Sequence, residues 1–414
     1  MLLCSRFGTG TVTVQRNSNL ISGFRKGRFD YKGFSSRSLG KMAAEKITNW
    51  VAPNDKSGEF KRGQSQFRNF IKKGGEFPPE AGRYHLYVSY ACPWAHRTLI
   101  VRQLKGLQDI IPFTSVHWHM QELGWHFASS PNADNSPGEN VRPDPVKGHE
   151  GYKHIRDVYF EVDPEYKGRF TVPTLYDVKQ GKIVSNESSE IIRMFYTEAC
   201  LSPFHLLKLF KDDIWKRSVQ RLMYLLGQFD DLLAPEYKNV SLFPSALQSQ
   251  IEATNEWTYN DINNGVYKSG FATTQEAYEK AVKTLFGSLD KVEKHLSEVT
   301  DGPFYFGKEI TEADVRLYTT IVRFDVVYVQ HFKTNLRTIR ADYPYIHKWL
   351  RNLYWNIPAF KDTTEFTHIK NHYTKSHTQI NPFSITPLGP EPPILKVDEE
   401  VPAVAYALKM TGKK

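Results

Sequence analysis

The sequence predicts an α/β domain followed by an all-α domain. Between residues 81 and 205, β-rich runs alternate with stretches in which apolar residues recur at helical spacing. From residue 206 to residue 375 the helical spacing continues almost without interruption. The chain has 414 residues, of which 40% are hydrophobic and 24% charged, which is the composition of a globular protein long enough for two to three domains.

The N-terminal segment has an unusual composition. Residues 1–41 are rich in Arg and Ser and hold eight basic residues but one acid, Asp30. This composition is typical of a mitochondrial transit peptide, and a disordered basic tail is the alternative. Met42 could be a second start, so we expect a mitochondrial product, a cytoplasmic one or both. Residues 42–80 are polar, contain Gly and Pro, and are predicted to form a segment that leads into the fold.

Each element of the α/β domain, residues 81–205, has a local signal. Residues 83–91 alternate in hydrophobicity and predict a strand, which runs directly into a helical pattern that should end at Gly106. Residues 121–165, rich in Gly, Pro, Asn and Asp, predict a long irregular insertion. A strand is predicted at residues 110–118, and a strand interrupted by Pro173 at residues 169–177. Residues 182–195 predict a strand, a polar turn and a helix start.

The all-α domain, residues 206–375, shows a clear helix start. Thr311 and Asp314 form a variant of the capping box, in which each residue satisfies a free backbone N–H of the first turn. Residues 376–414 are Pro-rich and weakly patterned, and are predicted to be a C-terminal tail. Helices are predicted at residues 212–233, 244–263, 274–298, 311–330 and 342–354.

Charge and composition exclude several functions. The net charge is +9, but almost all of it lies in residues 1–41, so the rest of the chain does not predict nucleic-acid binding. No stretch without charged residues reaches the roughly 18 residues that a membrane span needs. His117, His119 and His126 lack a Cys or carboxylate partner at a ligand spacing, so no metal site is predicted.

Cys92 is predicted to be a nucleophile. It follows a strand and precedes Pro93, which suits the first turn of a helix. The thiol would then face unpaired N–H groups at the positive end of the helix dipole, so its pKa should fall from about 8.5 into a range of about 3.5–7.5. An inert buried cysteine is the alternative.

No second cysteine stands at the resolving position of Cys92-Pro93-Trp94-Ala95. A single nucleophilic thiol must form a mixed disulfide with an external thiol, and a second external thiol must release it. Cys200 is predicted to be structural, and Cys4 lies in the basic N-terminal segment. Three cysteines cannot form a disulfide framework and are typical of a reducing compartment.

Two further features suggest a peptide-like ligand. Pro173 cannot donate a hydrogen bond within a central strand, and a cis Val172–Pro173 bond would turn the Val172 backbone toward a ligand; an edge strand is the alternative. Ser188 at a helix N-terminus could hold a carboxylate, and Glu187 an ammonium group, as in the α-amino acid end of a γ-glutamyl group. A plain helix cap is the alternative here.

These motifs together resemble a known family. The chain contains YVSYACPWAHRTLI, RFTVPTLYD, SNESSEIIRMF, NNGVYKSGFATTQEAY, ITEADVRLYTTIVRFDVVYVQHFK and IKNHYTKSHTQINP, which span roughly residues 80–380. They resemble the glutathionyl-hydroquinone reductases, which are the Xi-class or omega-like glutathione transferases. The resemblance implies the glutathione transferase fold, with an N-terminal thioredoxin-like domain and a C-terminal helical domain.

The resemblance also implies the site residues. The nucleophile falls on Cys92, and catalytic or site-lining tyrosines fall on Tyr267, Tyr328 and Tyr373. The glutathione contacts fall on Trp125, Arg169, Phe170, Thr171, Val172, Glu187 and Ser188. The chain departs from shorter family members in its basic N-terminal extension and in a longer stretch after Trp125.

The function implied by this resemblance is reduction of S-glutathionyl-hydroquinones through a Cys92–glutathione mixed disulfide. Glutathione would be a co-substrate, with no permanently bound cofactor, and a homodimer is expected. A general omega-like thioltransferase or dehydroascorbate reductase is the alternative enzyme, because the same sulfur chemistry serves both. A non-catalytic binding module on the same fold is a third hypothesis.

Overall fold

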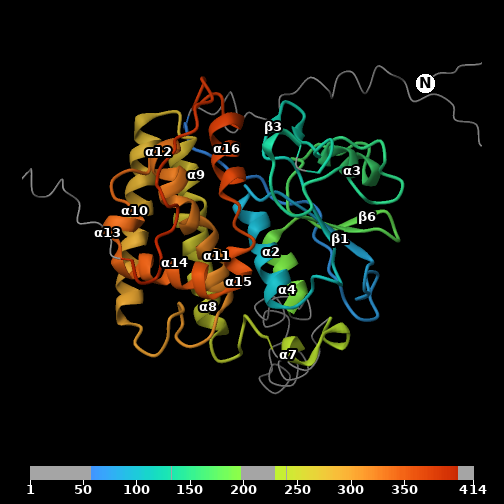
Figure 1. The fold of residues 1–414 in the computed structure, drawn as a ribbon, viewed down its shortest axis with the longest axis horizontal. Helices are drawn as coiled ribbons and strands as arrows, with labels where there is room; N and C mark the ends of the chain where they lie inside the picture. The colour runs from blue at the N-terminus through green and yellow to red at the C-terminus, as the bar shows by residue number, and fades with distance from the viewer. Residues whose placement is uncertain (1–56, 132, 197–228, 239, 400–414) are drawn as a thin grey trace, which may run out of the picture. The chain divides into compact units, whose positions relative to one another are not determined.

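The computed structural model describes residues 57–131, 133–196, 229–238 and 240–399. These residues all belong to one compact unit of the chain (Figure 1). The predictions for residues 1–41, for Cys4 and Cys200, and for most of the helix at 212–233 lie outside the described residues. No helix in the described part of the chain is long and apolar enough to cross a membrane.

The α/β half is built on a four-stranded mixed sheet in the order β2-β1-β5-β6. Strand β1 (Tyr84–Val88) pairs in parallel with β2 (Phe113–Ser115) and antiparallel with β5 (Thr174–Asp177), which pairs antiparallel with β6 (Lys182–Ser185). Every residue of β1 is buried, because both faces of the sheet are covered. This arrangement confirms the predicted strands, although each is shorter than expected.

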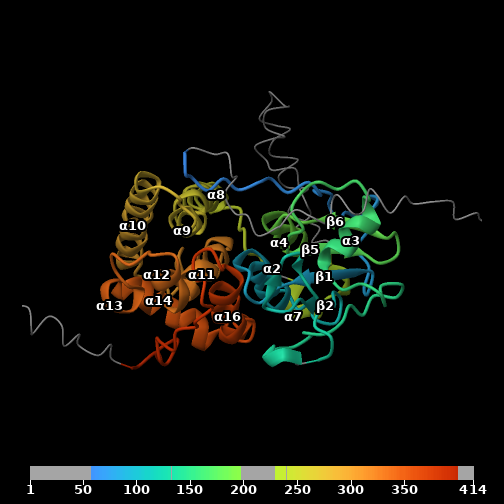
Figure 2. The ribbon, with the colours of Figure 1, turned by 90° about the horizontal axis from the view of Figure 1, so that it is seen from above.

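Three helices cover the sheet. Helices α2 (Pro93–Leu104) and α4 (Ser188–Tyr196) lie between the sheet and the helical half, and α3 (Ile155–Val162) lies on the other side (Figures 1 and 2). Gly106 has φ +66° directly after the C-cap residue Lys105. A left-handed residue at this position ends a helix, so the predicted end of α2 is confirmed.

The helical half follows the predicted order. Helix α10 (Gln275–Glu298) occupies the predicted segment almost to the residue, and Thr311 and Asp314 form the predicted capping box at the start of α11 (Glu312–Arg323). The remaining elements are η2 (Asp230–Leu232), α7 (Pro235–Lys238), α8 (Gln248–Thr258), η3 (Tyr259–Asn263), α9 (Gly265–Gly270), η4 (Phe324–Tyr328), α12 (Val329–His331), α13 (Ile339–Asp342), α14 (Pro344–Asn356), α15 (Pro358–Lys361) and α16 (Phe366–Ser376).

Two local predictions are wrong. The segment 121–165 is not irregular throughout: it holds the end of a small hairpin, β3 (Met120–Gln121) and β4 (Gly124–Trp125), the short η1 (Ala133–Asn135) and helix α3. Strand β5 begins at Thr174, after Pro173, so the residues before Pro173 are not part of the strand. This placement avoids a ladder position at which a proline has no N–H to donate.

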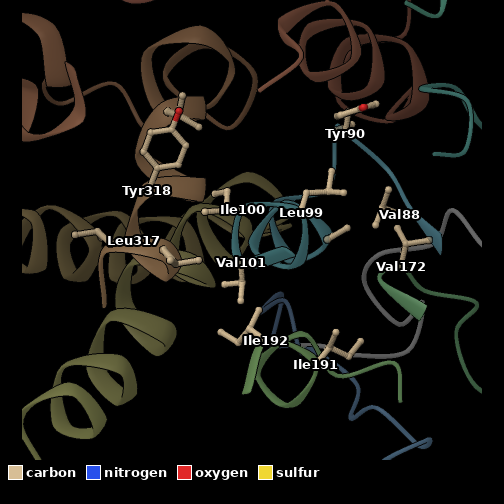
Figure 3. Packing of buried hydrophobic residues seen from close by; sticks show 14 of the residues in the cluster. Val88, Tyr90, Leu99, Ile100, Val101, Val172, Ile191, Ile192, Leu317 and Tyr318 are labelled. Carbon is tan, nitrogen blue, oxygen red and sulfur yellow. The ribbon is translucent and has the colours of Figure 1, made fainter. Parts of the chain in front are cut away.

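Helix α2 joins the two halves through the core. Leu99, Ile100 and Val101 are completely or almost completely buried. Figure 3 shows them among side chains from the sheet region, from α4 and from α11, namely Val88, Val172, Ile191, Ile192, Leu317 and Tyr318. Close packing of this kind resists small displacements, so the N-terminus of α2 is held firmly relative to both halves.

Candidate active site

Cys92 lies at the predicted junction of strand and helix. It is the N-cap residue of α2, with Pro93 in the first turn, and its side chain is only partly buried. The Sγ atom lies 3.4 Å from the Val172 carbonyl oxygen, a distance at which a thiol donates a weak hydrogen bond. The N–H groups of Trp94 and Ala95 point at the sulfur from the first turn of the helix.

The pKa of Cys92 differs from the expectation. Burial raises the pKa of this thiol above its ordinary value. The N–H groups of Ala95 and Trp94 and the guanidinium groups of Arg62 and Arg323 act in the opposite direction, but they do not outweigh burial. The predicted fall of the pKa is therefore wrong for this structure, because the helix N-terminus also lies deep between the two halves.

Arg323 of α11 holds the turn that carries Cys92. Its guanidinium donates to the carbonyl oxygens of Tyr90 and Ala91, at 2.8 and 3.1 Å. It also donates to Nδ1 of His96 on α2, at 3.0 Å. Burial and the charge of Arg323 hold the pKa of His96 well below its usual range, so the ring is neutral and can accept this bond. A residue of the helical half thus holds the turn that carries Cys92 in the other half.

The three predicted tyrosines meet beside Cys92. The Tyr373 hydroxyl lies 2.6 Å from that of Tyr267 and 3.0 Å from that of Tyr328, so the three form one hydrogen-bonded chain. They come from α16, α9 and η4, and all are at least nine-tenths buried. Burial raises the pKa of Tyr328 to about 12 and raises the other two further above their usual value. All three therefore hold their protons at neutral pH.

Glu187 and Ser188 stand at the N-terminus of α4, as predicted. Glu187 accepts hydrogen bonds from the Ser189 backbone and hydroxyl, at 3.1 and 2.9 Å, and from the Ser65 hydroxyl at 3.0 Å. Burial raises its pKa, but these bonds and the charge of Arg62 outweigh burial and hold the pKa below its ordinary value. The structure therefore keeps a carboxylate at this position, beside the buried Ser188.

The segment before β5 contacts Cys92 through Val172. Val172 is buried, its peptide bond to Pro173 is cis, as predicted, and its carbonyl oxygen is the one nearest to Cys92. The Thr171 carbonyl oxygen accepts from the Tyr159 hydroxyl at 2.9 Å. The Phe170 ring packs among Tyr159, Phe160 and Tyr166, whereas Arg169 is exposed.

Trp125 occupies a different position from the other predicted contacts. It lies in β4, is 4% exposed, and stacks on His372 with 4.5 Å between ring centroids. His372 precedes Tyr373 in α16, so Trp125 borders the tyrosine chain. Its ring contact is thus with α16 rather than with Glu187 and Ser188 at the N-terminus of α4. Within the described ranges, no group of three or more His, Cys, Asp or Glu residues gathers as metal ligands.

Arg62 is a site residue that the sequence analysis missed. Its guanidinium carbon lies 4.1 Å from the centroid of the ring of Trp94, two residues after Cys92. Its charge acts on Cys92, Glu187 and Tyr267. Arg62 lies in the segment 42–80, which showed no helical or strand pattern. The available signal was the cluster of Phe and Arg residues in GEFKRGQSQFRNF, since loops held by a rigid scaffold often carry function.

Fold and site together define a glutathione transferase. Residues 91–198 match the family model of the glutathione S-transferase N-terminal domain, and residues 275–352 match that of the C-terminal domain. The match is consistent with the sheet order, the cis proline and the helical half described above.

Comparison with similar proteins indicates which class of glutathione transferases the chain belongs to. The chain is 49% identical to glutathione S-transferase omega-like 2 of Schizosaccharomyces pombe, over 85% of this chain and 98% of that protein. It is 41% identical to glutathionyl-hydroquinone reductase YqjG of Escherichia coli, over 82% of this chain and 92% of that one. The crystal structure of the Xi glutathione transferase ECM4 from Saccharomyces cerevisiae in complex with glutathione matches with a TM-score of 0.71 and 44% identity, covering 82% of this chain and 100% of that chain. The chain therefore belongs to the Xi-class, omega-like glutathione transferases, a group that includes glutathionyl-hydroquinone reductases.

Proposed function

We propose that this protein reduces S-glutathionyl-hydroquinones to hydroquinones and produces oxidised glutathione. One observation supports this proposal most strongly: the Cys92 thiol stands at a helix N-terminus beside a chain of three protonated tyrosines. A thiol suffices for disulfide exchange, whereas cleavage of an aryl thioether also needs a proton donor. The name of the E. coli relative agrees with this reaction.

In the first step, the Cys92 thiolate attacks the glutathione sulfur of the substrate. A sulfur–sulfur bond forms, the bond from sulfur to the ring breaks, and its electron pair goes to the ring carbon. That carbon then gains a proton, for which Tyr267 is the proposed donor, with Tyr328 and Tyr373 as hydrogen-bonding partners. Over the whole step, the Cys92 thiol loses one proton and the ring carbon gains one. The step therefore balances when Cys92 is protonated at rest.

In the second step, a free glutathione thiolate attacks the sulfur of the bound glutathione. The mixed disulfide breaks, oxidised glutathione leaves, and Cys92 returns as a thiolate. The N–H groups of Trp94 and Ala95 and the charges of Arg62 and Arg323 stabilise that leaving thiolate. The same groups therefore assist Cys92 both as nucleophile and as leaving group.

The proposed glutathione site lies along one edge of Cys92. The Glu187 carboxylate would bind the α-ammonium group, and the Ser188 hydroxyl with the α4 N-terminus the α-carboxylate. The Val172 backbone would pair with the cysteinyl part of glutathione, which places the glutathione sulfur beside Sγ. Arg169, Phe170, Thr171 and Trp125 are retained as proposed contacts from the family resemblance.

The reaction can be tested with the full-length protein. Incubation with oxidised glutathione, followed by peptide mass spectrometry, should show the adduct on Cys92, and the Cys92→Ala variant should lose turnover of a glutathionyl-hydroquinone. The Cys200→Ala variant is the control and should keep it. Full activity of Cys92→Ala would contradict the mechanism. Faster turnover of a small mixed disulfide than of the aryl thioether would favour the thioltransferase function instead.

Two further proposals rest on the sequence. The composition of residues 1–41 supports mitochondrial targeting, and the family resemblance supports a homodimer. A fluorescent protein fused behind residues 1–41 should collect in mitochondria, and light scattering of the purified chain should give twice the mass of one copy. A diffuse signal or a monomer mass would contradict the respective proposal.

A further inference from the structure

Residues 57–71, here called the N-terminal strap, are anchored to the helical half at one end. The Gly58 carbonyl oxygen accepts from the Thr273 N–H at 3.1 Å, and Glu59 pairs with Lys280 of α10 at 2.8 Å. The buried Phe60 ring packs against Tyr267, with 6.1 Å between ring centroids. The strap thus touches the tyrosine chain directly.

The other end of the strap is anchored to the thioredoxin-like half. The Asn69 N–H donates to the Val184 carbonyl oxygen at 2.8 Å, and the Phe67 carbonyl oxygen accepts from the Asn186 N–H at 3.1 Å. The Ser65 hydroxyl donates to the Glu187 carboxylate at 3.0 Å. Because both ends are fixed, the exposed residues 61–64 are held over the site as a bridge between the two halves.

Arg62 occupies the middle of this bridge. Its guanidinium carbon lies 4.1 Å from the Trp94 ring centroid, and the buried Arg97 guanidinium contacts the same ring at 4.5 Å. Among the described residues, no carboxylate lies within ion-pair distance of Arg62. Trp94 follows Cys92 by two residues, so the strap holds an exposed positive charge at the first turn of α2.

We propose that Arg62 is a positioning residue that the N-terminal strap holds over Trp94 so that its charge stabilises the Cys92 thiolate. The inference rests on the proposed function only in taking Cys92 as the nucleophile. A cation in this place strengthens the attacking sulfur anion and also the sulfur anion that leaves when glutathione releases the mixed disulfide. The strap would then be part of the active site rather than a connection into the fold.

The other groups that face Cys92 explain why Arg62 matters. Arg323 is the second cation, but it is completely buried and committed to backbone carbonyl oxygens and His96. Tyr267 and Tyr328 face Cys92 from the helical half and are neutral, so they supply no charge. Burial opposes the thiolate, and Arg62 and Arg323 are the cations that counter it. Of the two, Arg62 can be replaced without disturbing the core.

The test compares Arg62→Met, which keeps the contact with Trp94 but removes the charge, with Arg62→Lys, which keeps the charge. The readout is the rate at which iodoacetamide alkylates Cys92 in the full chain as a function of pH, followed by mass spectrometry of the Cys92 peptide. At neutral pH we expect Arg62→Met to react about three- to tenfold more slowly than the wild type, with its pH midpoint shifted upward, and Arg62→Lys to stay close to the wild type.

The matched control is Arg68→Met, which removes another exposed strap arginine, one that pairs with Glu190 rather than facing Cys92. It should leave the alkylation profile unchanged. An unchanged midpoint in Arg62→Met, or an equal shift in Arg68→Met, would overturn the proposal. Because alkylation needs no glutathione substrate, the expected shift combined with absent hydroquinone turnover would overturn the proposed function and leave the role of Arg62 intact.

Discussion

The two ends of the candidate site surround their ionisable groups with different partners. At the sulfur end, Cys92 is only partly buried and faces the N–H groups of α2 and two guanidinium groups, all of which favour an anion. At the tyrosine end, three hydroxyl groups are buried together and bond to one another, which favours the neutral form. Both pKa directions are upward and the two guanidinium groups act on both ends, but only the sulfur also faces the N–H groups of a helix N-terminus.

In the proposed reaction, this difference assigns a separate role to each half of the fold. The thioredoxin-like half supplies the group that ionises, and the helical half supplies groups that keep their protons. Since a nucleophile must lose a proton and a general acid must hold one, the site can contain both at a single pH. The contrast predicts that changes at the two ends will have separable effects.

The largest effect is expected from Cys92→Ser. The hydroxyl is a far weaker nucleophile and cannot form a disulfide, so reduction of a glutathionyl-hydroquinone should fall on the order of 10⁴-fold or more. A serine could instead hold the thiolate of glutathione itself, and weak conjugating activity toward an electrophile should appear. Steady-state assays of both reactions on one preparation would measure the loss of reduction and the gain of conjugating activity. Retention of reduction would show that the sulfur end does not carry the first step.

Tyr373→Phe should have the next largest effect. It removes the central hydroxyl of the chain, to which both Tyr267 and Tyr328 bond. Without this bond Tyr267, the proposed donor, becomes a weaker general acid, and hydroquinone turnover should fall by up to the about 10²–10⁴-fold that general acid catalysis contributes. Disulfide exchange at Cys92 with oxidised glutathione should continue, because that step protonates no ring carbon.

The control for this variant is Tyr84→Phe. Tyr84 is equally buried, and its hydroxyl donates to the Pro78 carbonyl oxygen in the other half of the protein. It should lose stability without a selective loss of hydroquinone turnover. If Tyr373→Phe slowed both reactions equally, the proposed division between the two ends would be wrong.

The sequence predicts some parts of this arrangement better than others. Helix α10 is long, periodic and capped by Thr274, so its local signal suffices to place both ends. Helix α3 was missed because it has eight residues and because its N-cap residue, His154, is not one of the usual Ser, Thr, Asp or Asn. Local pattern therefore predicts long elements and fails for short elements held by their surroundings.

In the candidate site, too, local sequence pattern predicts less than the tertiary structure determines. The position of Cys92 follows from the strand–Cys–Pro–helix pattern, but its pKa does not, because burial between the two halves is a property of the whole fold. Tyr267, Tyr328 and Tyr373 are far apart in the chain, and only the family resemblance singled them out. Arg62 lies in a segment without periodicity, and its place is fixed by tertiary contacts such as that of Phe60 with Tyr267.

Arg323→Met tests how the sulfur end is held. The Met side chain fills similar space but leaves the carbonyl oxygens of Tyr90 and Ala91 without their arginine donor. Since each buried unsatisfied group costs about 1–3 kcal/mol, the free energy of unfolding should fall by about 2–4 kcal/mol, measured by denaturant titration. Alkylation of Cys92 should also slow, because the loss removes one of its two cations.

Arg337→Met is the matched control for Arg323→Met. Arg337 also lies in the helical half, but it forms an ion pair with Asp290, and the two side chains are 39% and 50% exposed. Removal of a surface pair should change the free energy of unfolding by no more than about 1 kcal/mol. Equal losses in the two variants would show that the Cys92 turn does not depend on the buried guanidinium.

The smallest effect concerns the pH profile of the wild type. Because burial raises the pKa of Cys92, its alkylation at pH 7 should be slower than that of free cysteine and should rise with pH to a midpoint above that of free cysteine. Hydroquinone turnover should follow the same rise, since the thiolate fraction limits it. It should fall again only toward pH 12, where Tyr328, with a pKa of about 12, begins to lose its proton.

The same pKa shifts determine how the free energy of unfolding changes with pH. The thiol and the tyrosines have higher pKa values in the folded chain than in the unfolded one, so the unfolded state loses these protons first as the pH rises. Below the pKa values of the unfolded chain, these groups make their full contribution to the free energy of unfolding. That contribution is lost as the pH rises toward the pKa values of the folded chain. Replacing Tyr373 by Phe should therefore flatten the alkaline decline in stability, and replacing Cys92 by Ala should flatten its earlier part. Alkylation that is already maximal at pH 7 would contradict the raised pKa at the sulfur end and leave the tyrosine end unaffected.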